Sequence, residues 1–306
     1  MDEANRAEPG VVVGDDGSDG ARLAVDWAAA EAEALGTCLV VVRTMTLPLP
    51  NVDFVPGVIT PVAGEIVADQ SFVDYAEQEL AETAAAIGRK RPGLSVRTRV
   101  RLGRASWELA DIGRQAELIV VGASGRSGVA RLLLGSTAAQ VVHTSARPVV
   151  VVRAAVEGQR RVVVGVDGSA ASVAAVRYAY DFADRHDCVL HAVHVWSDPP
   201  EDVFGPARSG GEGQPDPCDQ GERVLAEALT GLGELHPDVV VRREVALGRV
   251  AEVLLDQAEA ATLLVVGGHG RGALRGAFLG SVSHAMAYHA PCPVAIVREG
   301  VEEHPG

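Results

Sequence analysis

The sequence predicts an α/β fold built from two tandem doubly wound domains, each with a five-stranded parallel sheet and helices on both faces. Two observations predict it. Short β-branched runs, typical of buried parallel strands, alternate with segments of helical periodicity. The whole pattern then occurs a second time within the 306 residues. Alternating strands and helices form right-handed βαβ units, which give a parallel sheet covered on both sides.

The repeat is carried by motifs that recur in the same order. VVVGDDGS, beginning at Val11, recurs as VVVGVDGS beginning at Val162, and LIVVG, beginning at Leu118, recurs as LLVVG beginning at Leu263. Each copy is long enough to be a whole domain, which excludes a solenoid repeat. We therefore expect one domain over 1–155 and a second over 156–306, separated by the polar stretch 154–160.

The elements of the first copy follow from local signals. The expected strands cover 11–15, 38–44, 96–101, 117–122 and 148–153, and the expected later helices cover 72–89, 105–115 and 136–145. Ser18 is suited to cap the first helix and Gly36 to stop it. In that helix Leu23, Trp27, Ala30 and Ala34 share one side, which we expect to be the buried one.

Composition excludes several classes of protein. The formal net charge is −14, which disfavours a nucleic-acid partner because phosphates are held by clustered basic residues. The apolar runs are too short to span a bilayer, and the acidic N-terminus is unlike a secretory signal, so we expect a cytoplasmic protein without membrane contact. The 4 cysteines show no CxxC spacing, and no metal site is expected. Lys90 is the only lysine among 27 basic residues, a bias typical of a GC-rich genome.

The strongest chemical signal is a glycine motif, GxxG-x9-GS, that follows the fourth strand of each copy. It comprises Gly122, Gly125, Gly135 and Ser136, and again Gly267, Gly270, Gly280 and Ser281. Glycine lets the backbone approach a ligand closely, and exposed N–H groups next to a helix N-terminus form an anion site. Arg126 and Arg271, directly after the second glycine, could add a charged contact. A single copy could be an ordinary turn, but two copies at one spacing favour phosphate binding.

Three familiar motifs of nucleotide-binding proteins and hydrolases are excluded by particular residues. A Walker A loop needs a lysine, and Lys90 is nowhere near a glycine loop. The glycines after the first strand, Gly14, Gly17 and Gly20, do not have the GxGxxG spacing of a dinucleotide fingerprint. No GxSxG elbow with a plausible triad is present, and we predict no catalytic residues.

Taken with VGxDGS at the end of strand one, the glycine motif resembles the ATP-binding branch of the universal stress proteins, and the resemblance covers nearly the whole chain twice. It implies a strand order of 3-2-1-4-5, with ATP between strands one and four. It also implies that the last strands of the two domains pair antiparallel, which makes the chain a pseudo-dimer. Tandem members of this kind are common in actinobacteria.

The resemblance also implies a cofactor-binding set in each domain. Asp16 and Asp167 would lie near adenine and ribose, Thr44 and Val195 would meet adenine, and Thr137 and Val282 would line the phosphate pocket. The full expected set is Gly14, Asp16, Thr44, Gly122, Gly125, Arg126, Gly135, Ser136, Thr137, Gly165, Asp167, Val195, Gly267, Gly270, Arg271, Gly280, Ser281 and Val282. The two aspartates could instead stabilise the turn before the helix.

The copies differ at a few of these places. Asp15 stands where the second copy has Val166, and its extra negative charge is expected to weaken nucleotide binding in the first domain. His269 replaces Ser124, and Arg43 stands where the second copy has His194. No function follows from Arg43 or His194 at this level.

The expected function is a nucleotide-dependent regulator of stress or dormancy responses that binds one ATP per domain, with Mg²⁺ as an optional companion. Two alternatives remain open. One is a slow ATPase or adenylyl-transfer enzyme on the same fold, and the other is a scaffold whose ATP site is vestigial. A homodimer is expected in addition to the pseudo-dimer, because apolar edge strands favour pairing.

Overall fold

The structure is a computed structural model that describes residues 10–45, 70–125, 134–154, 160–196, 216–270 and 279–299. The first half contains five strands and four α-helices within these ranges. In chain order they are β1 (Val11–Gly14), α1 (Asp19–Ala34), β2 (Leu39–Met45), α2 (Gln70–Lys90), β3 (Val96–Leu102), α3 (Ala105–Ile112), β4 (Leu118–Gly122), α4 (Ser136–Thr144) and β5 (Val149–Val152).

The second half repeats this order and adds one short helix. Its elements are β6 (Arg161–Gly165), α5 (Ala170–Arg185), β7 (Val189–Trp196), α6 (Pro217–Leu229), α7 (Leu232–Leu235), β8 (Val241–Leu247), α8 (Val250–Ala258), β9 (Leu263–Gly267), α9 (Ser281–His289) and β10 (Val294–Val297). Most ends differ by one or two residues from the sequence prediction. The expected helix over 105–115 ends at Ile112 and continues as a 3-10 turn, Gly113–Gln115.

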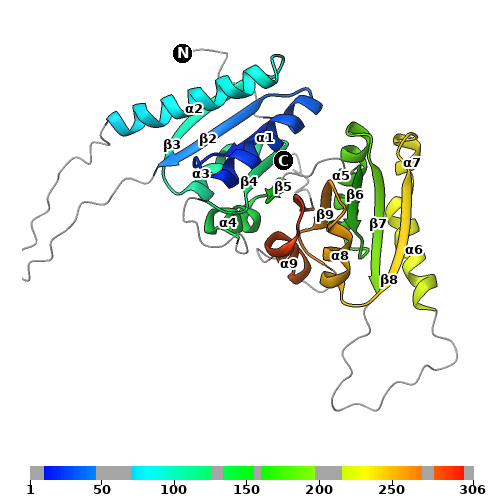
Figure 1. Cartoon of the computed structure of the whole chain (residues 1–306). Helices are drawn as coiled ribbons and strands as arrows, with labels where there is room; N and C mark the ends of the chain where they lie inside the picture. The colour runs from blue at the N-terminus through cyan, green and yellow to red at the C-terminus, as the bar shows by residue number, and fades with distance from the viewer. Residues whose placement is uncertain are drawn as a thin grey trace, which may run out of the picture.

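All ten strands form a single sheet in the order β3-β2-β1-β4-β5-β10-β9-β6-β7-β8. Each half therefore has the predicted order 3-2-1-4-5, and the strands within each half are parallel. Figure 1 shows the two halves side by side, the first from blue to green and the second from green to red.

The halves join through their last strands, as the family resemblance implied. β5 and β10 run antiparallel, with Val150 opposite Ala295 and Val149 opposite Ile296. Each of these strands is a run of buried aliphatic residues. Because the pairing hides two apolar edges from water and satisfies their backbone groups, it stabilises the contact between the halves.

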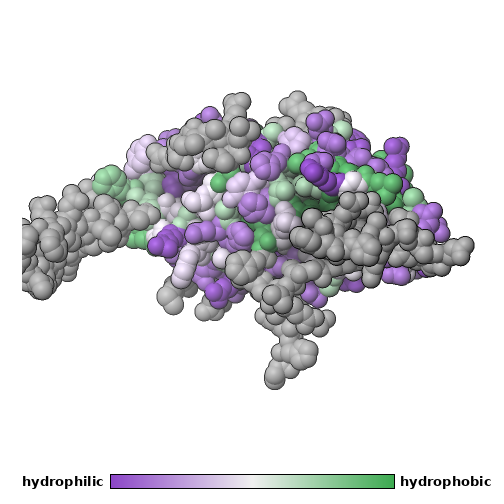
Figure 2. Space-filling view, turned by 90° about the horizontal axis from the view of Figure 1, so that it is seen from below, coloured by the Kyte–Doolittle hydropathy of each residue, from purple (hydrophilic) through white to green (hydrophobic). Residues whose placement is uncertain are grey.

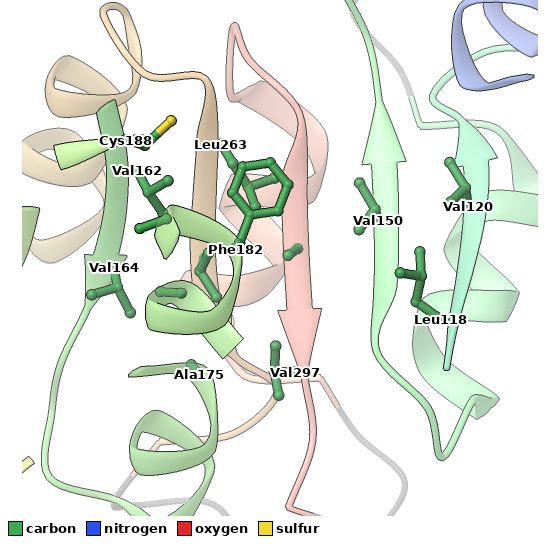
Figure 3. Packing of buried hydrophobic residues seen from close by; sticks show 14 of the residues in the cluster. Leu118, Val120, Val150, Val162, Val164, Ala175, Phe182, Cys188, Leu263 and Val297 are labelled. Atoms are coloured by element: carbon green, nitrogen blue, oxygen red, sulfur yellow. The ribbon is translucent and has the colours of Figure 1, made fainter. Parts of the chain in front are cut away.

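The sheet is covered on both faces, and each face has its own core. Alternate strand residues pack under α1, α2, α5 and α6 on one face, and under α3, α4, α8 and α9 on the other. Both clusters run across the join, so the halves share their hydrophobic cores. Figure 3 shows members of the first cluster from both halves, among them Val150 and Phe182.

The first helix does not bury the side that its largest residues suggest. The residues turned to the sheet are small, with Ala24, Ala28 and Ala32 fully buried, whereas Leu23 and Trp27 are only partly buried. Small side chains let the helix lie close to the sheet, which leaves the large ones for another contact. Trp27 stacks on Phe182 of the second half, with ring centroids 6.2 Å apart.

Other signals in the first helix are confirmed. Ser18 accepts a hydrogen bond from the backbone N–H of Ala21 at 3.1 Å, as an N-cap should. Ser169 caps α5 in the same way. Gly36 follows the helix with a φ of +65°, the left-handed conformation that terminates helices and favours glycine.

The surface of the described residues is of mixed polarity. Figure 2 shows hydrophilic and hydrophobic residues interspersed over one face. The exposed large apolar side chains include Trp107 and Leu247. Within the described ranges, no helix has the length and apolar character needed to cross a bilayer.

Candidate functional site

The topology creates one crevice in each half. β1 lies between β2 and β4, and the chain turns toward β2 on one side before it crosses to β4 on the other. The strand order therefore reverses between the carboxyl ends of β1 and β4, and β6 and β9 repeat this arrangement in the second half. In open α/β sheets this switch point is where ligands bind, because the loops on the two sides diverge there.

A cavity of about 220 Å³ occupies the crevice of the first half. Its lining includes every described residue that the sequence assigned to this domain. These are Gly14, Asp16, Thr44, Gly122, Gly125, Gly135, Ser136 and Thr137. Arg126 lies outside the described residues.

The corresponding cavity of the second half measures about 430 Å³. It again gathers all the described residues that the sequence assigned, namely Gly165, Asp167, Val195, Gly267, Gly270, Gly280, Ser281 and Val282. Arg271 lies outside the described residues. Small-molecule sites usually have volumes of about 300–1,000 Å³, so the second cavity falls in this range and the first lies below it.

Each strand-one aspartate has the turn-stabilising role that the sequence left open, and its contact with a ligand stays a prediction. One oxygen stabilises the turn: Oδ1 of Asp16 accepts from the N–H of Ser18 at 3.0 Å, and Oδ1 of Asp167 accepts from the N–H of Ser169 at 2.9 Å. The other oxygen faces the glycine loop, since a Cβ placed on Gly125 would lie only 2.7 Å from Oδ2 of Asp16. The aspartate thus ties the strand-one turn and points a carboxylate oxygen into the crevice.

The glycine loop needs its glycines for two different reasons. At Gly125 and Gly270 a side chain would collide with the aspartate carboxylate. At Gly122 a Cβ would lie 2.6 Å from the backbone oxygen of Gly20, so this glycine lets α1 pack closely against the end of β4. Gly122 therefore serves the fold as well as the cavity, and replacing it would not be a clean test of ligand binding.

The phosphate-side helices start in the way an anion site requires. The N–H of Gly135 donates to Ala123 O at 2.8 Å, which closes the loop and leads into α4. Gly135 and Gly280 are the N-caps of α4 and α9, and no side chain accepts from the first turn of either helix. Ser136 and Ser281 are the first helical residues, exposed, and do not cap their own helices. Both serines line the cavities, and the first N–H groups of the two helices have no side-chain acceptor, so a ligand could serve as their partner.

Sequence reasoning missed the apolar wall of each cavity. In the first half it comes from Val42, Leu109 and Val121, and in the second from Val193, Leu254 and Val266. Leu109 lies against Gly14, where a Cβ would come within 3.0 Å of the leucine side chain. Helical periodicity could have pointed to Leu109 as an inward residue of α3, but not to its position over the end of β1.

The extra acid of the first half is buried and paired with an arginine. The Asp15 side chain is 4% exposed, and its Oδ2 accepts from the guanidinium of Arg43 at 2.9 Å. Arg43 also forms an ion pair with Glu79 of α2, so one arginine is shared between two carboxylates. The pairing reduces the charge that Asp15 presents to the crevice, and the expectation that it weakens binding there stays a prediction.

Arg43 and His194, which sequence reasoning left without a role, occupy equivalent places and bind the same backbone group. Nε of Arg43 donates to Asp15 O at 3.2 Å, and Nδ1 of His194 bonds Val166 O at 2.7 Å. Both side chains hold the end of strand one from behind the cavity. His269, the other difference between the copies, lines the second cavity where Ser124 lines the first.

The lining residues offer both hydrogen-bond donors and acceptors. Backbone N–H groups donate, serine and threonine hydroxyls can donate or accept, and the aspartate carboxylate accepts, beside an aliphatic wall. Within the described ranges, no group of three or more His, Cys, Asp or Glu side chains could hold a metal ion.

Comparisons with known proteins agree with this geometry. The sequence model of the universal stress protein family matches residues 10–153 and again residues 159–298. A universal stress protein of Mycolicibacterium smegmatis is 36% identical over 95% of this chain and 97% of its own length. One of Mycobacterium tuberculosis is 34% identical, covering 96% of both chains. The crystal structure of a universal stress protein from Archaeoglobus fulgidus covers 95% of this chain and 98% of its own, with a TM-score of 0.68 at 22% identity, which supports the fold. The chain therefore belongs to the universal stress protein family and carries two copies of its domain in tandem.

Proposed function

We propose that each half binds one ATP at its switch point and that the protein acts as a nucleotide-dependent regulator. The most direct support is that the residues expected from the sequence to contact the nucleotide lie together in space. Sixteen residues, chosen from the sequence for nucleotide contact and spread over many separate segments, line two equivalent cavities.

The proposed orientation follows from the chemistry of each cavity wall. Adenine would lie against the aliphatic wall formed by β2, α3 and β4 in the first half, and by β7, α8 and β9 in the second, where apolar surface is removed from water. The ribose would lie near Asp16 or Asp167, whose inward oxygen can accept from a hydroxyl. The phosphates would meet the loop N–H groups and the first turn of α4 or α9.

Binding, rather than turnover, is the function that we propose, with Mg²⁺ as an optional companion of the phosphates. ATP would act by stabilising the conformation that binds it, and the linked gain in stability is about 2.7 kcal/mol at one hundred times the dissociation constant. The alternative, slow hydrolysis or adenylyl transfer, predicts release of phosphate or pyrophosphate in a single-turnover measurement. The expected cytoplasmic location, the homodimer and the absence of a nucleic-acid partner remain predictions.

The test uses the full chain and two charge-blocking variants. Ser136→Glu and Ser281→Glu place a carboxylate where we expect phosphate, while an acidic residue in the first turn favours the helix itself. Isothermal titration with ATP, with and without Mg²⁺, should show two sites in the parent protein and one site in each variant. Thr144→Glu and His289→Glu add the same carboxylate at the opposite, exposed ends of α4 and α9 and should leave two sites.

Native nucleotide content provides an independent measurement. The purified protein is denatured, and the released small molecules are identified by mass spectrometry. Adenine nucleotide in the parent protein, and less of it in the double variant Ser136→Glu/Ser281→Glu, supports the proposal. If no nucleotide is released and titration detects no binding of ATP in either half, the proposal is wrong.

A further inference from the structure

Each half holds the far end of the other half's phosphate-side helix with an arginine. Nη2 of Arg298, which directly follows β10, donates to His143 O at 2.6 Å and Val142 O at 3.0 Å, in the last turn of α4. Nη2 of Arg153, which directly follows β5, donates to Ala287 O at 3.0 Å, in the last turn of α9. The two contacts are equivalent and run in opposite directions across the join.

The antiparallel pairing explains why these contacts form. β5 ends next to the beginning of β10, because Val151 lies opposite Val294. The turn that precedes β10 comes directly from the C-terminus of α9, so an arginine at the end of β5 reaches the last carbonyls of that helix. The same relationship carries Arg298 to the last turn of α4. Both arginines are therefore placed by the pairing of the strands that joins the halves.

The chemistry of the contact is favourable. The last carbonyls of a helix lack intrahelical donors and form the negative end of its dipole, which a cation stabilises. Nη2 of an arginine carries two N–H groups, so Arg298 serves two carbonyls from this one nitrogen. Burial also lowers the pKa of both guanidinium groups below their usual value, as expected for cations partly removed from water.

Arg298 also lies beside the glycine loop of its own half, and in the first half the residue before Arg153, Val152, accepts from the N–H of Ala123 in the glycine loop at 2.8 Å. The carbonyl of Val297 accepts from Gly268 at 2.7 Å, and a Cβ on Gly268 would lie 3.0 Å from Cγ of Arg298. Gly268 O in turn accepts from Gly280, the N-cap of α9, at 2.9 Å. Arg298 therefore contacts the loop of the second site with its stem and the helix of the first site with its guanidinium.

We propose that Arg153 and Arg298 couple the two nucleotide sites, so that occupancy of one strengthens binding at the other. This inference rests on the proposed function. An anion at the N-terminus of α4 orders that helix, which fixes the carbonyls that hold Arg298 and, through its stem, the loop of the second site. Binding of the second ligand then costs less conformational entropy, and this produces positive cooperativity without a large change of shape.

The test measures the ATP affinity of one site in the full chain while the other site is either functional or blocked by a substitution. Closing the first site with the uncharged Gly125→Leu, whose side chain would occupy the crevice beside Asp16, should weaken ATP binding at the second by at least about fivefold, the lower end of typical couplings. Coupling is reciprocal, so Gly270→Leu should weaken the first site by the same factor. In the Arg153→Gln/Arg298→Gln protein, closing one site should change affinity at the other by less than about twofold.

Two further variants keep the result interpretable. Arg147→Gln removes an arginine whose Nε donates to Arg114 O at 2.9 Å within one half, and it should preserve the coupling. If the double glutamine variant does not fold, Arg153→Lys/Arg298→Lys keeps the charge but loses the planar fork, and the coupling should still fall.

The outcomes separate this inference from the proposed function. Absence of ATP binding in the unaltered protein would reject the proposed function. Two ATP molecules bound without any mutual effect would reject the coupling alone. Coupling that survives the loss of both arginines would also overturn the inference, because another connection would then carry it.

Discussion

The guanidinium of Arg43 donates to a carboxylate oxygen of Asp15 at 2.9 Å, behind the turn that carries Asp16. The second half has His194 and Val166 in the equivalent places, and there a ring nitrogen of His194 bonds the backbone oxygen of Val166. The two halves therefore support the end of strand one with different pairs of side chains. We expect each pair to depend on both of its members.

A double-mutant cycle tests this dependence. Arg43→His should destabilise the protein by about 3 kcal/mol, because it leaves the buried Asp15 carboxylate without its cation. Asp15→Val should lower the free energy of unfolding by a smaller amount, since Arg43 keeps its ion pair with Glu79. The double variant reproduces the histidine–valine pair of the second half. Its loss in free energy of unfolding, measured by urea unfolding, should be at least about 1 kcal/mol smaller than the sum of the losses in the two single variants. If the loss in the double variant equals the sum of the two single losses, Asp15 and Arg43 do not depend on each other.

The two cavities should differ in affinity for ATP. The second, at about 430 Å³, has room typical of a small-molecule site, whereas the first measures about 220 Å³. We therefore expect Ser281→Glu to remove the tighter of the two binding events and Ser136→Glu the weaker one. Titration of the two variants side by side decides the order, and a tighter site in the first half would show that the described cavity volume is a poor guide.

The contact between the halves also contains a buried ion pair. Glu31 of α1 is 1% exposed, and its carboxylate accepts from Arg185 at 2.8 Å and contacts His186 at 2.7 Å, both on the second half. Glu31→Gln should lower the free energy of unfolding by about 2 kcal/mol, because the amide removes the negative charge and replaces one of the two acceptor oxygens with an NH₂ donor.

A neighbouring glutamate provides the control for that measurement. Glu33 lies two residues away on the same helix and pairs with Arg91 within the first half, where both side chains are partly exposed. Glu33→Gln should cost less than about 1 kcal/mol, as exposed pairs do. Equal costs for the two substitutions would mean that Glu31 does not support the join.

Acid should weaken the join through His143. Burial, followed by the neighbouring Arg298 and His284, lowers the pKa of His143 below its usual 6.5. The unfolded chain therefore takes up a proton at a higher pH than the folded protein does. The stability that depends on neutral His143 is complete above about pH 6.5 and is lost as the pH falls below it. His143→Gln should flatten this part of a stability profile measured from pH 8 to pH 5, and an unchanged slope would contradict the assignment.

Much of the fold and of the site could be predicted from the sequence, for identifiable reasons. Short β-branched runs and helical periodicity predict β1 to β5 and their helices, and the glycine spacing predicts which segments meet around each cavity. The antiparallel join of β5 and β10 came from the family resemblance, because edge strands alone do not reveal their partner.

Other features depend on packing in three dimensions and were missed. The alanine side of α1 faces the sheet because close approach outweighs the size of Leu23 and Trp27, and periodicity counts only hydrophobicity. The Arg43 network joins residues 28 and 36 positions apart, and no local pattern predicts such partners. Gly122 was assigned to ligand contact alone, and its closeness to Gly20 became visible only once both loops were placed.

The strand contact that joins the halves also determines how the protein responds to dilution. Two separate chains paired through such strands would dissociate as their concentration fell, whereas a covalent connection keeps the partner at a high effective concentration. The two halves therefore remain in a one-to-one ratio at every expression level. Variation in the amount of protein would change the number of paired sites but not the way in which one site of a pair affects the other.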